Sequence, residues 1–526
     1  MKQVLYVIII LIAILIIIYF IKIRPTANQS LQQKEVTSVK KPVILLIIDS
    51  LMDEPLKKAV NDGRAPALKY LIDHGYYVPD LVSSYPTMSV TIDSTLLTGT
   101  YSDKHRVPGL VWYDEKEKRF VSYGSARKEV FKLGTKQVIE DCVYHLNHSH
   151  LNRDVKTIHE RLAENGLQSA SINALVYRGV EKKTLRLSET LSKLDIMPDQ
   201  LRIETPRLFS YGTFAQFNPK NNRHNDLWES YGFNNQFSAS ELKYLIQNEK
   251  LPAFTIAYFP DLDKEVHKKG PVHHIGAIEK VDKQLQDIFN TYESWDIAIE
   301  DNVWIAMGDS GQAEVKSDKN QSLIDLKMIL RDYRIHNITE PIKEDDQLVL
   351  GLNERMTFIY ILDPNLALDE IVQHLKWDER IQIIAWKQGN DIHVMKGGKE
   401  GKLIFHPDGE YQDEYDQSWH IEGDGSILDL TDRDRTIRYG DYPDGLARLY
   451  SSLHSHSGKY LVVDAKPGYE FVGEGSPTHP GGAAHGSLHK QDSFIPMIVT
   501  GTETKPKHRR IIDLQPWILQ MIQEEA

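Results

Sequence analysis

Several acidic residues of this chain lie at the ends of short, almost continuously apolar runs. Asp49 follows the run 43–48, and Asp309 closes the run 303–307 after one glycine. Runs of this kind are typical of strands that are buried on both faces of a parallel sheet. Because the carboxyl ends of parallel strands meet at one edge of the sheet, residues that follow such strands gather there. The sequence therefore predicts an α/β fold with a polar site assembled from several strand ends.

Helical segments alternate with these runs. Residues 67–74 predict a helix, preceded by proline and followed by glycine, and residues 154–165 predict another, followed by a strand over 168–172. Such alternation predicts a doubly wound, mostly parallel sheet, and we expect one large domain over residues 41–526.

The character of the chain changes between about residues 340 and 445. A strand–helix–strand stretch leads there into short strands with glycine turns, so we expect a smaller α+β subdomain inserted into the large domain. The turn Lys396-Gly397-Gly398-Lys399 lacks the glycine spacing of a phosphate-binding loop, and it predicts an exposed hairpin turn.

Residues 4–21 form an uninterrupted apolar run. At roughly 1.5 Å per residue this run is about 27 Å long, close to the hydrocarbon thickness of a bilayer. No small-residue cleavage site follows it, so we expect a transmembrane anchor over 1–21, rather than a cleaved signal peptide, and a polar linker over 22–40. The protein would be a single-pass cell-membrane protein with its catalytic domain outside the cytoplasm, although the nearly balanced flanking charges do not fix the orientation.

Charge and cysteine content exclude some classes of function. The formal net charge is −12, which argues against a nucleic-acid-binding protein because such proteins need a basic face. Cys142 is the one cysteine of the sequence, which excludes an intramolecular disulfide framework and a cysteine-based zinc finger.

The segment 258–271 carries the most specific pattern. Asp263 and His267 are four residues apart, so a helical turn would place both side chains on one face, where they could chelate a divalent ion. Asp261 competes with Asp263, but its spacing to His267 is poorer.

Five stretches of the sequence resemble the type I phosphodiesterase/nucleotide pyrophosphatase family of the alkaline phosphatase superfamily. They are Ile47-Ile48-Asp49, the helix 65–75, the nucleophile segment 85–101, the Asp-x-x-x-His-x-x-Gly-Pro signature within 258–271, and His485-Gly486-Ser487-Leu488-His489 followed by Ile495-Pro496-Met497. The resemblance covers roughly residues 41–520, although the region 340–445 adds no motif.

The resemblance implies two divalent ions, held by oxygen and imidazole ligands: one ion by Asp263, His267 and His485, and the other by Asp49, Asp309 and Ser89. Zinc is the expected metal, with manganese or magnesium possible at a weakened site. Ser89 would be the nucleophile at the start of a helix, where free N–H groups and the helix dipole favour a phosphoryl group. Thr87 and Thr91 are alternatives, but Ser89 keeps the spacing to Thr98-Gly99 at the end of the helix.

Two positions depart from the family pattern. Ser310 stands where the family usually carries a histidine, and a serine hydroxyl is a much poorer ligand for zinc than imidazole. Ile92 stands where phosphodiesterase members often carry an asparagine that contacts phosphate. The second ion is therefore expected to bind weakly, to be a harder ion, or to be lost together with turnover.

Other residues have weaker signals. Trp112 and Tyr113 could line a substrate pocket by stacking, although packing in the core explains them equally well. His145, His148 and His150 resemble a metal cluster, but the Asn and Ser between them predict a solvated loop.

The resemblance implies a metal-dependent hydrolase of phosphate esters, of the phosphodiesterase or nucleotide pyrophosphatase type, acting outside the cytoplasm. Its partners would be a phosphorylated small molecule or surface polymer, and the membrane through the N-terminal helix. Two other functions stay open. A member impaired by Ser310 could bind a phosphorylated ligand or a protein without turnover, and a transferase could pass the phospho-group to an acceptor other than water.

Overall fold

The computed structural model describes residues 35–37, 39–186, 200–224, 230 and 232–525. The predicted transmembrane helix over 1–21 and most of the predicted linker lie outside these residues. Among the helices of the described ranges, none combines the length and the apolar character that crossing a bilayer requires.

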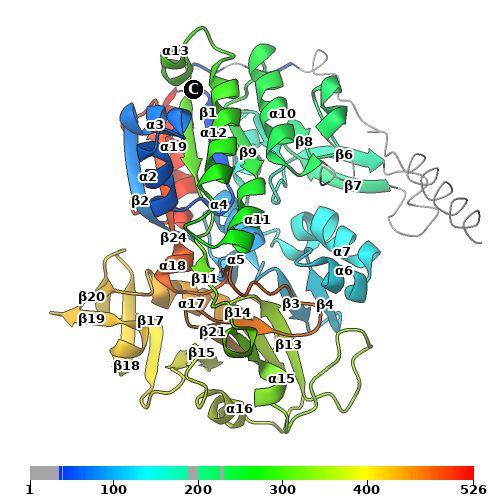
Figure 1. Cartoon of the computed structure of the whole chain (residues 1–526), viewed down its shortest axis with the longest axis vertical. Helices are drawn as coiled ribbons and strands as arrows, with labels where there is room; N and C mark the ends of the chain where they lie inside the picture. Colours follow the sequence, from blue (N-terminus) through cyan, green and yellow to red (C-terminus); the bar gives the residue numbers. More distant parts are fainter. Residues whose placement is uncertain (1–34, 38, 187–199, 225–229, 231, 526) are drawn as a thin grey trace, which may run out of the picture.

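A mixed sheet lies at the centre of the larger part of the described chain (Figure 1), with strand order β2–β24–β10–β1–β9–β5–β8. The strands are β1 (Val43–Ile48), β2 (Gly75–Val82), β5 (Ser169–Ile172), β8 (Leu208–Ser210), β9 (Phe254–Phe259), β10 (Val303–Met307) and β24 (Phe494–Thr500). The five strands from β10 to β8 run parallel, whereas β24 pairs antiparallel with β10, and the edge strand β2 pairs antiparallel with β24. The sheet is thus parallel through its centre, as expected, and mixed overall.

Both faces of this sheet are buried. Odd-numbered residues of β1 pack into one hydrophobic core and even-numbered residues into another, so the strand is apolar throughout. The first core includes residues of α4 (Ser89–Thr98), α8 (Ile158–Glu164) and α19 (Leu514–Glu525). The second includes residues of α2 (Asp53–Asn61), α3 (Pro66–Asp73), α10 (Asn235–Gln247) and α12 (Ile275–Phe289). Helices therefore cover both faces, as the sequence alternation predicted.

Local sequence signals explain where these helices begin. Pro66 occupies the first turn of α3, where its missing N–H costs no hydrogen bond. The helix predicted over 154–165 begins later, at Ile158, because Thr157 caps it. The Thr157 hydroxyl accepts from the N–H of Glu160 at 3.2 Å, and the Glu160 carboxylate accepts from the N–H of Thr157 at 2.8 Å.

A second sheet forms the smaller part of the molecule (Figure 1), in the order β13–β14–β21–β15–β16–β17–β20–β19, with β18 also paired to β17. Its strands are β13 (Leu348–Asn353), β14 (Met356–Ile361), β15 (Ile381–Gln388), β16 (Asp391–Met395), β17 (Leu403–Asp413), β18 (Ser418–Gly423), β19 (Leu430–Arg433), β20 (Thr436–Tyr439) and β21 (Tyr460–Ala465). Strand β21 lies beyond residue 445 and pairs with both β14 and β15, so the sheet extends past the expected insertion. The Lys396–Lys399 turn joins the antiparallel strands β16 and β17, as a hairpin connection does.

Buried polar contacts join the second sheet to segments before and after α4. Asn353, the last residue of β13, accepts from the N–H groups of Leu110 and Val111 through one side-chain oxygen. Asp464 of β21 accepts from the hydroxyl of Tyr85, which precedes α4, at 2.7 Å. The β13–β14 hairpin is thereby held beside the carboxyl ends of the parallel strands.

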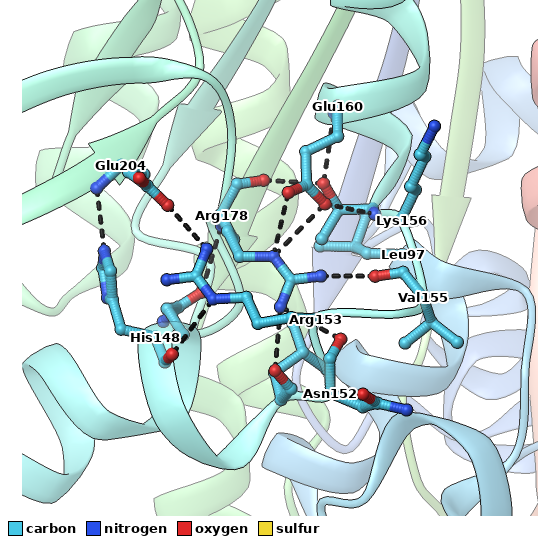
Figure 2. Close-up of polar contacts among 12 residues, drawn as sticks. Leu97, His148, Asn152, Arg153, Val155, Lys156, Glu160, Arg178 and Glu204 are labelled. Carbon is cyan, nitrogen blue, oxygen red and sulfur yellow. Dashed lines mark hydrogen bonds and ion pairs between the residues drawn. The ribbon is translucent and has the colours of Figure 1, made fainter.

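A buried arginine fixes the segment that leads from η2 (Asp141–His150) to α8 (Figure 2). The Arg178 side chain is fully buried; it donates to the Glu160 carboxylate at 3.1 Å and to the carbonyl oxygens of Leu151 and Val155 at 2.8 and 2.5 Å. Each nitrogen of the guanidinium therefore finds an acceptor, as a buried charged group requires.

The expected solvated loop at His145, His148 and His150 is wrong, because these residues lie on η2. His148 accepts from the backbone N–H of Glu204 at 2.8 Å (Figure 2), and His150 is buried against the Tyr123 hydroxyl. Tertiary contacts thus order a polar segment whose local sequence favours a loop.

Candidate active site

The six ligands implied by the sequence converge at the carboxyl ends of β1, β9 and β10. Asp49 follows β1 directly, Asp309 follows β10, and α11 (Asp261–Lys269) follows β9. Five of the six line one cavity of about 570 Å³: Asp49, Ser89, Asp263, His267 and His485. Asp309 lies just behind this wall, fully buried, and accepts from the Ser89 hydroxyl at 2.9 Å.

Helix α11 places Asp263 and His267 on one face. The Nε2 atom of His267 lies 3.1 Å from Oδ1 of Asp263, the contact expected for residues four apart on a helix. Asp261, the competing candidate, instead exchanges hydrogen bonds with Asn235, away from the cavity. The structure therefore favours Asp263 over Asp261 as the carboxylate of this site.

The two histidines of the site are oriented by backbone carbonyls. His267 Nδ1 lies 2.8 Å from the carbonyl oxygen of Ala483, and His485 Nδ1 lies 2.5 Å from that of Thr87. Because a carbonyl oxygen can only accept, each Nδ1 carries a proton, and each Nε2 is the ring atom left to bind an ion. His485 Nε2 lies 3.9 Å from Asp263 Oδ1, so both Nε2 atoms lie near the same carboxylate. This is the tautomer and second-contact arrangement of histidines that bind metal ions.

The site carries a surplus of negative charge. Burial, together with the nearby carboxylates of Asp309 and Asp263, raises the pKa of Asp49 well above its ordinary value. Burial lowers the pKa of His267, but the carboxylates of Asp263 and Glu354 outweigh it and raise that pKa to about 10. Such a cluster attracts a cation, and a divalent ion would displace the proton from the imidazole. Ligand atoms of Asp263, His267 and His485 lie within 4.8 Å of one another, which fits a divalent ion.

Ser89 is the first residue of α4, and both Ser89 and Val90 line the cavity. The first N–H groups of a helix have no intrahelical acceptor and favour an anion. Thr87 and Thr91 are both fully buried, and neither lines this cavity. Ile92 packs in the hydrophobic core. Of the three candidate hydroxyls, the one of Ser89 faces the cavity.

The second set of implied ligands, Asp49, Asp309 and Ser89, surrounds buried hydrogen bonds. Asp309 Oδ1 accepts from the backbone N–H groups of Ser50 and Ser310, at 2.8 and 2.7 Å. The Ser310 hydroxyl is buried and has no hydrogen-bond partner among the described residues. Asp49, Asp309 and Ser89 supply oxygen ligands, a set that suits magnesium or manganese better than zinc.

Three further residues contact these carboxylates, and no sequence motif marks them as residues of the site. Tyr258 donates to Asp49 at 2.5 Å, and Ser50 donates to Asp263 at 2.9 Å. Gln312 donates to Asp263 at 2.7 Å. Their positions on or just after strands that end at the site were the available signal, but a Tyr, Ser or Gln near a strand end is too common to single out.

Trp112 and Tyr113 lie elsewhere. They line a separate cavity of about 730 Å³, together with basic residues that include Lys104, Arg106 and Lys387, and they do not border the cavity at Ser89. Both belong to β3 (Val111–Asp114), and both rings are buried in the core beneath that cavity. The cavity at Ser89 is therefore formed without Trp112 and Tyr113.

Comparison with known proteins identifies the family of the chain. The sequence matches the Type I phosphodiesterase / nucleotide pyrophosphatase family over residues 43–488. No curated protein matches the chain. Similar solved structures include murine ectonucleotide pyrophosphatase / phosphodiesterase 5, 12% identical with a TM-score of 0.55, covering 92% of this chain and 95% of that one. An inactive variant of that murine protein was solved in complex with AMP, with a TM-score of 0.54, 12% identity and the same coverage.

A phosphonoacetate hydrolase from Sinorhizobium meliloti 1021, in complex with phosphonoformate, is similar as well. It is 14% identical with a TM-score of 0.53, covering 93% of this chain and 97% of that one. At such identities these structures show the fold, which is alkaline-phosphatase-like, whereas the sequence match spans most of the chain. The protein therefore belongs to the type I phosphodiesterase/nucleotide pyrophosphatase family, whose members hydrolyse phosphoesters.

Proposed function

We propose that this protein is a metal-dependent phosphodiesterase that uses Ser89 as its nucleophile. The observation that carries the proposal is the Ser89 hydroxyl, which faces the cavity at the start of α4 and donates to Asp309 at 2.9 Å. Asp263, His267 and His485 line the same cavity.

The residues divide the reaction into two displacements. Ser89 Oγ forms a bond to phosphorus while the bond to the leaving alcohol breaks, and Asp309 Oδ2 holds the hydroxyl proton of Ser89 before attack. Water then cleaves the Ser89–phosphorus bond, so one diester and one water yield a monoester and an alcohol. The N–H groups of Ser89 and Val90 are placed to bind the phosphoryl oxygens. Divalent ions held by the two ligand sets would supply positive charge beside those oxygens and lower the pKa of the serine hydroxyl.

The proposal includes a location outside the cytoplasm. Its support is the apolar run 4–21, which lies outside the described residues and is long enough to span a bilayer. Protease added to intact cells or spheroplasts should then digest the catalytic domain, while a cytoplasmic marker stays intact.

The test of function is release of p-nitrophenol from bis-p-nitrophenyl phosphate with added Zn²⁺, Mn²⁺ or Mg²⁺. We expect turnover that chelation abolishes, and Ser89→Ala and His485→Ala should each lower it at least about 1,000-fold. Thr91→Val is the matched control on the same helix and should retain activity. Activity that survives both Ser89→Ala and His485→Ala would end the proposal.

A second candidate is a catalytically impaired member that binds a phosphorylated ligand. The buried Ser310 hydroxyl favours it, because a ligand imidazole is missing beside Asp309. The variant Ser310→His separates the two: a gain in bound metal or turnover supports the hydrolase. No gain in either, with no turnover by the unmodified protein, supports the impaired binder.

A further inference from the structure

The tip of the β13–β14 hairpin enters the active site from the second sheet. Glu354 begins the two-residue turn between Asn353 and Met356, with a positive φ of 57° in a place where glycine is the favoured residue. Its carboxylate accepts from the N–H of His485 at 3.2 Å, and its other oxygen lies 3.8 Å from Nε2 of His267. A turn position that favours glycine thus holds a carboxylate against two histidines of the site.

His479 approaches the same point from the other side. Its Nδ1 lies 3.0 Å from one oxygen of Glu470, its backbone N–H donates to the other at 2.5 Å, and Glu470 is fully buried. Because the Glu470 carboxylate accepts a hydrogen bond from Nδ1–H, Nε2 of His479 is the ring atom left to bind an ion. The ring stacks on His267 with centroids 4.3 Å apart, and His479 lines the cavity. A carboxylate behind the imidazole is the arrangement that orients metal-binding histidines.

The ligand atoms of His267, Glu354 and His479 lie within 4.8 Å of one another, as do those of Asp263, His267 and His485. Both groups use His267, and the one lone pair on its Nε2 binds a single ion. The two groups are therefore parts of one site. We propose that Glu354 and His479 are metal ligands that join Asp263, His267 and His485 around one ion; the proposal rests on the metal dependence proposed above.

The composition of the two ligand sets points the same way. Asp49, Asp309 and Ser89 offer oxygen ligands alone, and Asp49 already accepts a hydrogen bond from Tyr258. The three imidazoles and two carboxylates around the other ion form a much stronger set for zinc. Affinity is thus concentrated at the ion nearer Glu354.

The test is the zinc affinity of the metal-free protein, measured by competition with a chromophoric chelator. Glu354→Gln and His479→Gln should each weaken the tightest zinc about 10- to 100-fold. His273→Gln, an exposed histidine just beyond α11, is the matched control and should leave the affinity unchanged. Thermal unfolding of each metal-free variant checks that it is folded, and the absorption spectrum of bound Co²⁺ should change in both variants.

Two results separate this proposal from the proposed function. Unchanged zinc affinity and Co²⁺ spectra in Glu354→Gln and His479→Gln, with affinity lost in His267→Ala, would overturn the two added ligands and leave the hydrolase standing. Turnover by fully chelated wild-type protein would overturn metal dependence itself. Ser89→Ala should lose turnover and keep the tight zinc, because Ser89 lies on the other side of the site.

A different observation concerns the rest of the same cavity. Beyond Ser89 its wall is formed by α6 (Arg127–Leu133), α7 (Thr135–Glu140), η2 and the segment 211–214. The side chains that face the cavity there are mainly apolar, and include Val130, Val138, Ile139, Val143, Leu175 and Phe214. Among the described residues that line the cavity there is no Lys or Arg, so the wall offers no cation for a second phosphate.

Asn173 and Tyr123, two polar residues on this wall, are already engaged in hydrogen bonds. Asn173 donates to the carbonyl of Gly232 and to Ser238, and its oxygen accepts from the N–H of Gly212. The Tyr123 hydroxyl is hydrogen-bonded to His150. These groups cannot also bind a ribose or the edge of a base without losing buried hydrogen bonds. We infer that the ester group accepted beside Ser89 is an aliphatic hydrocarbon chain rather than a nucleoside; this rests on the proposed function.

The test is a series of p-nitrophenyl alkyl phosphodiesters of increasing chain length, with the p-nitrophenyl ester of thymidine phosphate as the nucleoside probe. Each added methylene should raise kcat/KM about three- to fourfold until the cavity is filled. Ile139→Trp should lower the ratio of octyl to methyl ester activity, whereas the conservative Ile139→Val should keep that ratio. No dependence on chain length, or preference for the thymidine ester, would overturn the inference. Failure to hydrolyse any of these esters would instead count against the proposed function.

Discussion

Tyr258, on strand β9, donates its phenolic hydroxyl to Asp49 at the end of the neighbouring strand β1, with 2.5 Å between the two oxygens. The contact fixes one carboxylate oxygen of Asp49 and leaves the carboxylate facing the cavity. Strand β1 thus determines where Asp49 lies, and a side chain of the neighbouring parallel strand β9 fixes the orientation of its carboxylate.

Removing this hydroxyl should weaken catalysis without unfolding the protein. We expect Tyr258→Phe to lower kcat/KM for a p-nitrophenyl diester about 10- to 100-fold, because hydrogen bonds to charged groups contribute about 1.5–3 kcal/mol. Tyr292→Phe is the control, since Tyr292 contacts Asn302 far from the cavity. A Tyr258→Phe enzyme with wild-type kcat/KM would show that Asp49 does not need this contact.

The buried guanidinium of Arg178 should matter far more for stability than its exposed neighbour Arg153 (Figure 2). Replacing Arg178 with Met would leave Glu160 without its buried partner, and we expect a loss of about 3–5 kcal/mol in the free energy of unfolding. Arg153→Met removes a half-exposed ion pair with Glu204 and should cost less than about 1 kcal/mol. Urea unfolding of the two variants measures both values, and equal losses would contradict the account of Arg178.

Asp93 should give the protein a stability that falls as pH rises. Burial, with a smaller contribution from the carboxylate of Asp309, raises the pKa of Asp93 to about 8 from an ordinary value of 3.8. A carboxyl with a raised folded-state pKa stabilises the fold fully below its unfolded pKa, and this stabilisation is lost as pH rises through the folded pKa. We therefore expect Asp93→Asn to gain in melting temperature relative to wild type between about pH 4 and pH 8.

Asp93 lies on α4, and one of its oxygens is buried without a hydrogen-bond partner among the described residues, which fits a protonated carboxyl. The exposed pair of Asp73 and Lys69 offers a control, because Asp73→Asn should show no such trend. A difference in melting temperature between Asp93→Asn and wild type that is constant across this range would contradict the prediction.

Much of the central fold could be predicted from local sequence. Val43–Ile48 is apolar at every position because both faces of β1 are buried, and this marks a central parallel strand. The four-residue spacing of Asp263 and His267 encodes their contact on α11. The direction of β24 was not predictable, because an apolar run carries no signal for antiparallel pairing at the edge of a sheet.

The rest of the site depends on contacts between distant segments. Glu354 belongs to a hairpin of the second sheet, a region in which the sequence shows no motif, and only the packing of the two sheets places it beside His267. The orientation of the His479 ring depends on its hydrogen bond to buried Glu470, which no local pattern indicates. Trp112 and Tyr113 are aromatic, as residues of a pocket wall often are, but they lie on β3 and line another cavity.

The most direct test of the central claim is to trap the covalent intermediate. Wild-type protein is mixed with bis-p-nitrophenyl phosphate and divalent metal, quenched in acid, digested and analysed by mass spectrometry. We predict a p-nitrophenyl-phosphoryl group on Ser89, and none in the Ser89→Ala variant. An adduct on Thr87 or Thr91, or full turnover by Ser89→Ala, would contradict Ser89 as the nucleophile.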